Sequence, residues 1–347
     1  MADRDLAFPA VPQFVTATVA AVLAERTGLQ RVELSDGDRA YVLTGLIGPV
    51  APGDRVVVNT TAVELGLGTG GWHVVHWNLS RDGWSAPGGG HVMKLRYTSL
   101  QTDTGVAEED ADAVIPDGLA GTPVVVCDLH SQVGCVAAAF VATRPGAQLV
   151  FVMTDSAALP LALSDLVAEL RAAGRVAATV TCGQAFGGDV EAVNVVSGLL
   201  LASTLGDAVV VGPGPGVVGT RTRFGFGGLE GAAIVDAAHR RGGRPVVCVR
   251  WSDADARPSH RGVSHHTATV LAETGSPALI AVPTGGTIDG GTAIDSGRHD
   301  AVEVDVPDFA DLDLGDLTVM GRGVADDPGF FRWSAAAGVL AARLVSG

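Results

Sequence analysis

Residues 124–134, VVVCDLHSQVG, contain the pattern that decides the fold. A run of valines leads into Cys127 and stops at Asp128, and His130 follows shortly after. Apolar residues at consecutive positions are typical of a strand covered on both faces, as in a parallel sheet between two helical layers. The next stretch, SQVGCVAAAFVAT, is rich in small apolar residues and long enough for a helix. The segment therefore predicts a strand, a polar turn and a helix, which together form the unit of an α/β domain.

The rest of the C-terminal part repeats this alternation. Its further strand-like runs are QLVFVMT, VAATVTC, DAVVVG, RPVVCVR, PALIAVP and AVEVDV. Helix-like stretches such as LPLALSDLVAELRAAG and LEGAAIVDAAHRRG lie between them, and SAAAGVLAARLV predicts a last helix. We predict that residues 116–347 form a Rossmann-like three-layer α/β domain with a mostly parallel sheet, and that this domain carries the site.

The N-terminal part has a different rhythm. Short apolar or alternating runs, among them FVTATVAAVL, RVELSDG, DRVVVNTTAV and HVVHWNL, are separated by turns rich in Gly, Pro and Asp. Short strands at this spacing predict a small all-β domain, barrel-like or a sandwich, over residues 1–115. The acidic, turn-rich residues 108–122 are typical of a linker between two domains.

Composition and charge exclude several classes of partner. The chain is 47% apolar and 18% charged, as expected of a globular protein, and its net charge is −15. No basic run is present, so we expect neither a nucleic-acid partner nor binding to an anionic membrane. Lys94 is the sole lysine, and the Gly-rich loops therefore lack the lysine of a phosphate-binding P-loop.

Cellular location is inferred from the N-terminus and the cysteines. The first residues are acidic and interrupted by Pro, unlike a secretory signal, and no long uninterrupted apolar stretch predicts a membrane span. The four cysteines form no Cys-x-x-Cys pair. We expect a cytoplasmic protein with reduced thiols.

Polar residues follow the predicted strands at the edge where open parallel sheets bind ligands. Asp128, His130 and Asp155 are candidate catalytic residues, because a carboxylate can orient a histidine that acts as a base. Asp128 and His130 with Asp189 are candidate ligands of a divalent metal ion. The alternative for the first turn is purely structural, with an Asx-turn and with Ser131 capping the helix.

The loop GPGPGVVGTRTRFGFGG at 212–228 contains a GxGxxG pattern. Its two prolines, and the absence of an acidic residue after a following strand, argue against a dinucleotide site. Backbone N–H groups holding a phosphate or another anion, with Arg221 or Arg223 nearby, fit better, although a long structural turn is the alternative. The candidate ligand-binding residues of the Gly-rich turns and of the first helix are Ser131, Gly187, Gly188, Gly214, Gly216, Gly219 and Thr220.

RPSHRGVSHH at 257–266 is locally positive in an acidic protein. Arg257 and Arg261 are candidate anion-binding residues, since positive charge in a cleft attracts anionic ligands. His265 and His266 are candidate catalytic residues. Consecutive helical positions point about 100° apart, so we expect one of the two to face the site. A histidine at a helix start is also often a hydrogen-bonded structural group.

A cysteine nucleophile is a competing interpretation of the same edge. Cys182 ends a predicted strand and has His130, His266 and Asp155 as possible partners. Nothing resembling a nucleophile elbow is present, so we rank this interpretation below a metal or His/Asp site.

Five segments follow one another along the chain: DLHSQ, MTDSAALPLA, CGQAFGGDVEAVNVVSGLL, GPGPGVVGTRTRFGFGGLE and RPSHRGVSHHT. In this order they resemble a bacterial family called domain of unknown function 3866 (DUF3866). VVVNTTAVELGLGTGGWHVVHWNL resembles it too, so the resemblance extends over roughly residues 50–300. The resemblance implies no activity. It implies one two-part protein and points to the same strand-end motifs.

Two functions from different classes remain open. The first is a hydrolase, dependent on a divalent metal or on His and Asp, that acts on a small anionic or phosphorylated metabolite at the carboxyl edge of the sheet. The second is a non-catalytic metabolite-binding or regulatory protein. Assembly of a homo-oligomer through the apolar helices is a third possibility. The sequence specifies neither the substrate nor the metal.

Overall fold

The computed structural model describes residues 12–67, 70–86, 88–288 and 297–346. They belong to two compact units, one within Met1–Gly88 and Leu95–Thr102, the other within Gly89–Lys94 and Asp103–Gly347. The predicted domain limits at 115 and 116 stay a prediction. The expectation about a secretory signal concerns residues 1–11, which lie outside the described residues.

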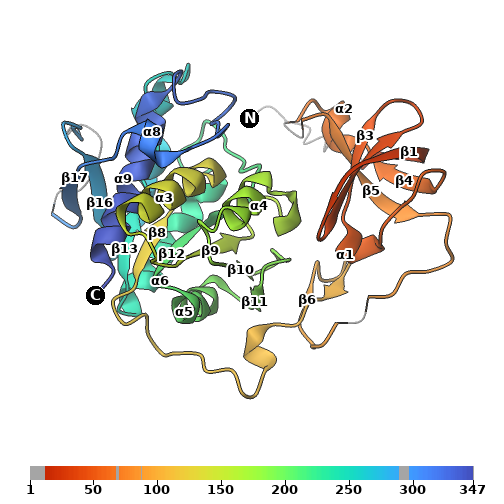
Figure 1. Cartoon of the computed structure of the whole chain (residues 1–347), viewed down its shortest axis with the longest axis horizontal. Helices are drawn as coiled ribbons and strands as arrows, with labels where there is room; N and C mark the ends of the chain where they lie inside the picture. Colours follow the sequence, from red (N-terminus) through yellow and green to blue (C-terminus); the bar gives the residue numbers. More distant parts are fainter. Residues whose placement is uncertain (1–11, 68–69, 87, 289–296, 347) are drawn as a thin grey trace, which may run out of the picture. The chain divides into compact units, whose positions relative to one another are not determined.

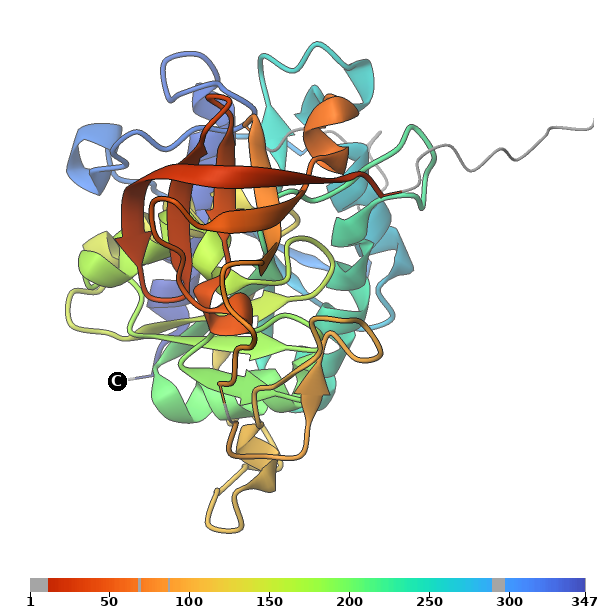
Figure 2. The same ribbon diagram turned by 90° about the vertical axis from the view of Figure 1, so that its right-hand side faces the viewer.

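The first unit is a closed five-stranded barrel with the strand order β1-β2-β3-β5-β4. The barrel closes because β1 pairs antiparallel with both β2 and β4. Apolar residues at every second position, such as Val56 and Val58, point inward and are fully buried. Figure 2 shows these strands in red and orange. The predicted barrel is confirmed. Its elements are β1 (Phe14–Arg26), β2 (Leu29–Leu34), β3 (Arg39–Val42), α1 (Thr44–Ile47), β4 (Arg55–Asn59), α2 (Thr61–Glu64) and β5 (Trp72–Asn78).

The second unit is built on an eight-stranded sheet with the order β11-β10-β9-β12-β8-β13-β16-β17. Every neighbouring pair in it is parallel. The predicted Rossmann-like α/β fold is therefore confirmed, and the sheet is more uniformly parallel than expected. Its strands are β8 (Pro123–Val126), β9 (Leu149–Thr154), β10 (Ala178–Cys182), β11 (Val190–Ala192), β12 (Ala208–Pro213), β13 (Arg244–Val247), β16 (Leu279–Pro283) and β17 (Asp300–Val304).

Helices cover both faces of the sheet, which explains the continuous apolar strands. Val125 packs in a core with Phe140 of α3 and Ala336 of α9, whereas Val124 and Val126 pack on the opposite face with helices α5, α6 and α7. Helices α3 and α9 lie side by side in Figure 1 and contact each other extensively. The helices are α3 (His130–Thr143), α4 (Asp165–Ala172), α5 (Val195–Leu205), α6 (Glu230–Arg240), α7 (His265–Glu273), α8 (Phe309–Leu312) and α9 (Pro328–Leu344).

Side-chain caps determine where several helices start. Ser164 accepts a hydrogen bond from a backbone N–H of α4, and Ser264 does the same for α7. At α3 the side-chain amide oxygen Oε1 of Gln132 accepts from the backbone N–H groups of Asp128 and Leu129. The suggestion that Ser131 caps this helix is wrong, because Ser131 is the second residue of α3 and Leu129 stands at the capping position, with no side-chain cap hydrogen bond.

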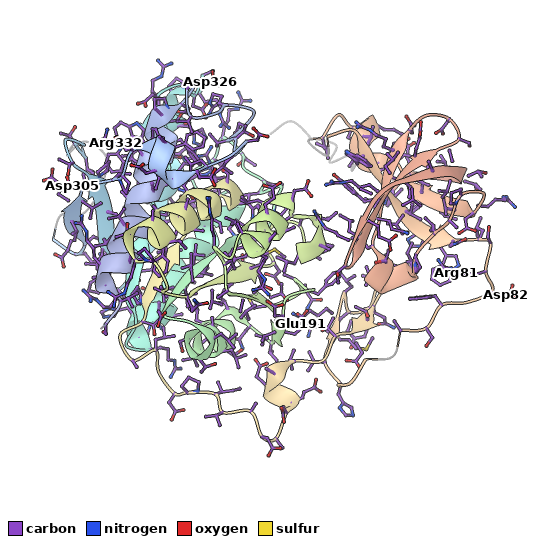
Figure 3. The ribbon with its side chains drawn as sticks, viewed as in Figure 1. Arg81, Asp82, Glu191, Asp305, Asp326 and Arg332 are labelled. Carbon is purple, nitrogen blue, oxygen red and sulfur yellow. The ribbon has the colours of Figure 1, made fainter. Side chains whose placement is uncertain are left out.

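Lys94 is a structural group. Its ammonium donates hydrogen bonds to a carboxylate oxygen of Glu191 at 2.6 Å and to the carbonyl of Thr181 at 3.2 Å, and the side chain is fully buried. Glu191, labelled in Figure 3, lies on β11. The ion pair holds Lys94 against the edge of the sheet. None of the helices in the described ranges combines the length and apolar character that a membrane crossing needs.

Candidate anion site at the carboxyl edge of the sheet

The site lies where the order of strands reverses. After β8 the chain builds β9, β10 and β11 on one side of it, whereas β13, β16 and β17 follow on the other side. Such a switch point is where open α/β sheets bind ligands. Asp128 follows β8, the Gly-rich loop follows β12, and Arg250 follows β13. These three neighbouring strand ends supply the framework of the site.

Three histidines meet beside this framework. His260 comes from the 3₁₀ turn η4 (Pro258–His260), and His265 and His266 open α7. One ring nitrogen from each lies within 4.8 Å of those of the other two. Of the two consecutive histidines, His265 is a lining residue of the adjoining cavity and His266 is not. At the first turn of α7 both rings lie close to that of His260, at 4.7 Å and 4.8 Å between ring centroids.

Neighbouring groups fix the orientation of two of these rings. Nη1 of Arg250 lies 3.0 Å from Nδ1 of His266, and Phe226 stacks flat on the same ring at 3.8 Å between centroids. Nδ1 of His260 lies 2.8 Å from the hydroxyl of Ser264. In both rings the nitrogen left for other interactions is Nε2.

Asp128 and Arg250 are the buried charged groups of the site. The hydroxyl of Thr267 donates to Asp128 at 3.0 Å and accepts from the backbone N–H of Arg250 at 3.0 Å. Burial raises the pKa of the Asp128 carboxyl to about 6, although Thr267 and Arg250 oppose the shift. Asp128 thus balances the charge of a guanidinium that is itself only 6% exposed.

The histidines are held in the neutral state. Burial, followed by the charge of Arg250, lowers the pKa of His260 to about 4 and that of His266 to about 3. The pKa of His265 is lowered for the same two reasons. At neutral pH all three rings are therefore uncharged, and each has one N–H donor and one acceptor nitrogen.

A cavity of about 1230 Å³ opens next to the histidines. Arg223 and Arg257 line it and form ion pairs with Glu273 and Asp255. Among the described residues that line it there is no aspartate or glutamate. The lining consists of Gly219, Thr220, Arg221, Arg223, Ala256, Arg257, Pro258, Ser259, His260, His265, Ala268, Thr269 and Ala272.

His130 has a structural environment outside the cavity. Its Nδ1 lies 3.0 Å from the carbonyl of Pro213 and its Nε2 lies 2.6 Å from the hydroxyl of Ser164. Burial lowers its pKa to about 4. The ring therefore joins the end of β12 to the cap of α4, and the structure does not bring it together with His265 and His266.

The predicted metal ligands do not form one group. Asp128 is bound by Thr267, His130 by Ser164 and Pro213, and Asp189 by the backbone and side chain of Thr179. Asp189 lies beside the first half of β10, away from the carboxyl end of that strand. In the part of the chain that the structure describes, the side chains close enough to share a metal are the three histidines.

The histidine cluster does not suit a metal ion either. The guanidinium of Arg250 can only donate, so Nδ1 of His266 is an acceptor and the proton of the neutral ring is on Nε2. A metal needs a free lone pair on the ring. His266 has none left, and the neighbouring positive charge opposes a cation further.

Five further predicted residues are not part of the cavity lining. Asp155 is exposed and accepts from the backbone N–H of Gln184 at 2.8 Å, apart from the cavity lining. Ser131 is half-buried on α3 and Arg261 is exposed, and neither is a lining residue. Gly187 and Gly188 donate backbone hydrogen bonds to Glu191 and Thr181 in the connection to β11.

Within the Gly-rich loop, only part of the predicted anion-binding set faces the cavity. Gly219 and Thr220 line it. A Cβ at Gly214 would lie 2.5 Å from the carbonyl of Ala158, so this glycine allows close backbone packing. Gly216 has φ +83°, which favours glycine. The loop is thus partly a structural turn, as the alternative interpretation held.

Cys182 is not equipped to act as a nucleophile. It is buried, its thiol points at the carbonyl of Met153, and burial raises its pKa to about 12. The thiolate that such chemistry needs is therefore not populated near neutral pH.

Arg250 and His260 were missed as central site residues. Both follow β13 at the carboxyl edge, so the rule that selected Asp128 applied to them equally. A single arginine ending an apolar strand is a signal that a buried charge needs partners. Phe226 carried no recognisable signal, because its stacking on His266 depends on how the loop folds back.

Fold and site together define an α/β protein with a Rossmann-like parallel sheet and a cationic, histidine-lined cavity at its carboxyl edge. The family model described as "Protein of unknown function (DUF3866)" matches residues 39–338. The chain belongs to this family, and the resemblance noted in the sequence is confirmed. A search of curated proteins finds no match to the chain.

Proposed function

We propose that the protein hydrolyses a small phosphorylated metabolite bound in the cavity at the carboxyl edge of the sheet. The observation that carries this proposal is the charge of the lining. Three arginines and two histidines face the cavity without an aspartate or glutamate among its described lining residues, in a chain of net charge −15. A local positive cavity in an acidic protein favours an anionic ligand.

The three arginines differ in how far an ion pair with a carboxylate offsets their charge. Arg223 is 3.0 Å from Glu273, and Arg257 is paired with Asp255 at 2.8 Å. Arg221 is exposed and has no ion pair among the described residues. Arg221 is thus the first candidate to bind a phosphate, with Arg257 as a second donor whose position is set by Asp255.

His265 is the candidate general base. It lines the cavity, is half-buried, and is neutral because its pKa is lowered. In the proposed step a water molecule gives a proton to His265 while its oxygen bonds to phosphorus. The phosphorus–oxygen bond to the alcohol breaks, the alcohol oxygen takes up a proton from solvent water, and His265 gives the proton that it gained back to the solvent. The products are one alcohol and one phosphate.

The test is phosphate release from a panel of phosphomonoesters by the full chain, compared with Arg221→Ala and His265→Gln. We expect release by the native protein, reduced binding in Arg221→Ala and loss of turnover in His265→Gln. Saturable binding of the esters without turnover would favour the metabolite-binding alternative. If the protein neither binds nor hydrolyses any ester of the panel, the proposal is overturned.

A further inference from the structure

We propose that Arg250 fixes His266 as a hydrogen-bond donor, and that the Nε2–H groups of His260 and His266 form a cradle for a phosphoryl oxyanion. The identity of the bound group rests on the proposed function. The positions of the protons follow from the contacts of the described residues alone. The two Nε2–H groups are the atoms of the proposed site that recognise the ligand.

The proton of His266 is located by Arg250. A guanidinium has five N–H donors and no acceptor. Its Nη1 lies 3.0 Å from Nδ1 of His266, so Nδ1 accepts. In a neutral imidazole the other nitrogen then carries the proton. His266 therefore has an Nε2–H group, and Arg250 is a positioning residue for it.

This Nε2–H group lacks an acceptor. The residue is 5% exposed, its Nε2 is buried, and no hydrogen-bond partner for that atom occurs among the described residues. Most buried donors in proteins are paired, so an unpaired one beside a cavity indicates a ligand acceptor. Phe226 stacks on the ring and holds it in this orientation.

Gly219 leaves space beside the donor. A Cβ at this position would lie 3.2 Å from Cε1 and 3.6 Å from Nε2 of His266. Gly219 is also a lining residue of the cavity. The missing side chain therefore leaves room between the cavity and Nε2 that a ligand oxygen can approach.

His260 presents a second donor by the same logic. The hydroxyl of Ser264 accepts from the backbone N–H of His266, and Nδ1 of His260 is its one acceptor among the described contacts. The hydroxyl proton thus goes to Nδ1, and the neutral ring carries its own proton on Nε2. His260 lines the cavity, and its ring centroid is 4.8 Å from that of His266.

An oxyanion satisfies this arrangement where a cation does not. It accepts several N–H hydrogen bonds at once, and it gains from the charges of Arg250 and Arg257. A phosphoryl group offers enough oxygens to accept from both rings and from Arg221. A divalent ion would meet two protonated nitrogens and a guanidinium.

The test uses the native full chain with ¹⁵N-labelled histidine, of which the sequence holds nine. Long-range ¹H–¹⁵N spectra report which ring nitrogen is protonated. We expect His266 and His260 as Nε2–H tautomers at neutral pH, with resonances that move when inorganic phosphate is added. An Nδ1–H tautomer for His266, or ring resonances that phosphate leaves unmoved, would overturn the proposal.

Variants and a metal titration complete the test. His266→Phe keeps the ring stack and removes the donor, so phosphate should bind at least about tenfold more weakly. His239→Gln, at an exposed histidine of α6, should bind phosphate as the native protein does. Stoichiometric cobalt binding with tetrahedral absorption, lost in His266→Phe, would contradict the cradle.

The outcomes also separate this inference from the hydrolase proposal. Nε2–H tautomers and phosphate binding without ester hydrolysis would support the cradle and refute the hydrolase. Ester hydrolysis by a protein whose His266 is the Nδ1–H tautomer would do the reverse.

Discussion

Nη1 of Arg250 donates a hydrogen bond to Nδ1 of His266 across 3.0 Å, which joins the end of β13 to the first turn of α7. The guanidinium also lies in the field of the buried carboxylate of Asp128. One buried cation thus orients a ring on one side and balances a carboxylate on the other. This relationship makes the site a single electrostatic unit.

The first prediction follows from that unit. Arg250→Met should lower the free energy of unfolding by about 3 kcal/mol, because it leaves the Asp128 carboxylate buried without its balancing charge. Adding Asp128→Asn should cost clearly less than the sum of the two single changes. Urea denaturation of the four proteins at pH 7.5 measures both quantities. Additive losses would show that the two groups are independent.

Arg221 and Arg223 provide a matched pair for ligand binding. Arg221→Ala should weaken phosphate binding about tenfold, since it removes a charge-assisted contact. Arg223→Ala should have a smaller effect, because Glu273 already offsets the charge of Arg223 at 3.0 Å. Isothermal titration with inorganic phosphate at fixed ionic strength checks this order. The reverse order would place the phosphate nearer Arg223.

The lowered pKa of the half-buried His130 predicts a dependence of stability on pH. Its folded pKa of about 4 lies below the ordinary value of 6.5, so the folded state binds fewer protons than the unfolded state between these values. The neutral ring's contribution is complete above pH 6.5. It is lost as pH falls through 6.5 toward 4, by on the order of 3 kcal/mol.

His130→Gln tests this contribution. Asp128, with a raised pKa of about 6, acts in the opposite direction, because its buried carboxylate costs stability as pH rises from about 4 to 6. The informative quantity is therefore the difference between native and variant protein. Chemical denaturation at pH 7.5 and 5.0 should show a smaller acid loss in His130→Gln. Equal losses would exclude His130 as the source.

The sequence predicted the fold because its signals are local. A valine run that ends at Asp128 identifies a buried strand, and alternating residues such as Val56 and Val58 identify the barrel. The edge that carries the site followed from the parallel order of strands. What could not be read was which polar side chains meet there. His130 contacts Ser164, and His266 contacts Arg250. Neither contact has a signal in the periodicity or spacing of the sequence.

Alanine substitutions at Gly216 and Gly219 distinguish an effect of backbone strain on stability from an effect on ligand access to the site. Gly216→Ala should cost about 1 kcal/mol of stability, since φ is +83° there, with no atom within 4 Å of the new methyl. Gly219→Ala should weaken phosphate binding, because its methyl would lie 3.6 Å from Nε2 of His266. Thermal denaturation and phosphate titration of both variants check the contrast. Equal phosphate affinities would show that Gly219 does not control the approach to His266.

Lys94 allows a chemical test of burial, because the sequence has no other lysine. Its ammonium is fully buried and bound to Glu191 at 2.6 Å, so an amine-reactive ester should not modify it in the folded protein. Modification should appear in urea at the same denaturant concentration as unfolding, measured by mass spectrometry of the peptide that contains Lys94. Lys94→Met should cost about 3–5 kcal/mol, because it leaves the Glu191 carboxylate half-buried without its partner. Rapid labelling of Lys94 without denaturant would mean that the segment opens locally, and then the loss in Lys94→Met should be small as well.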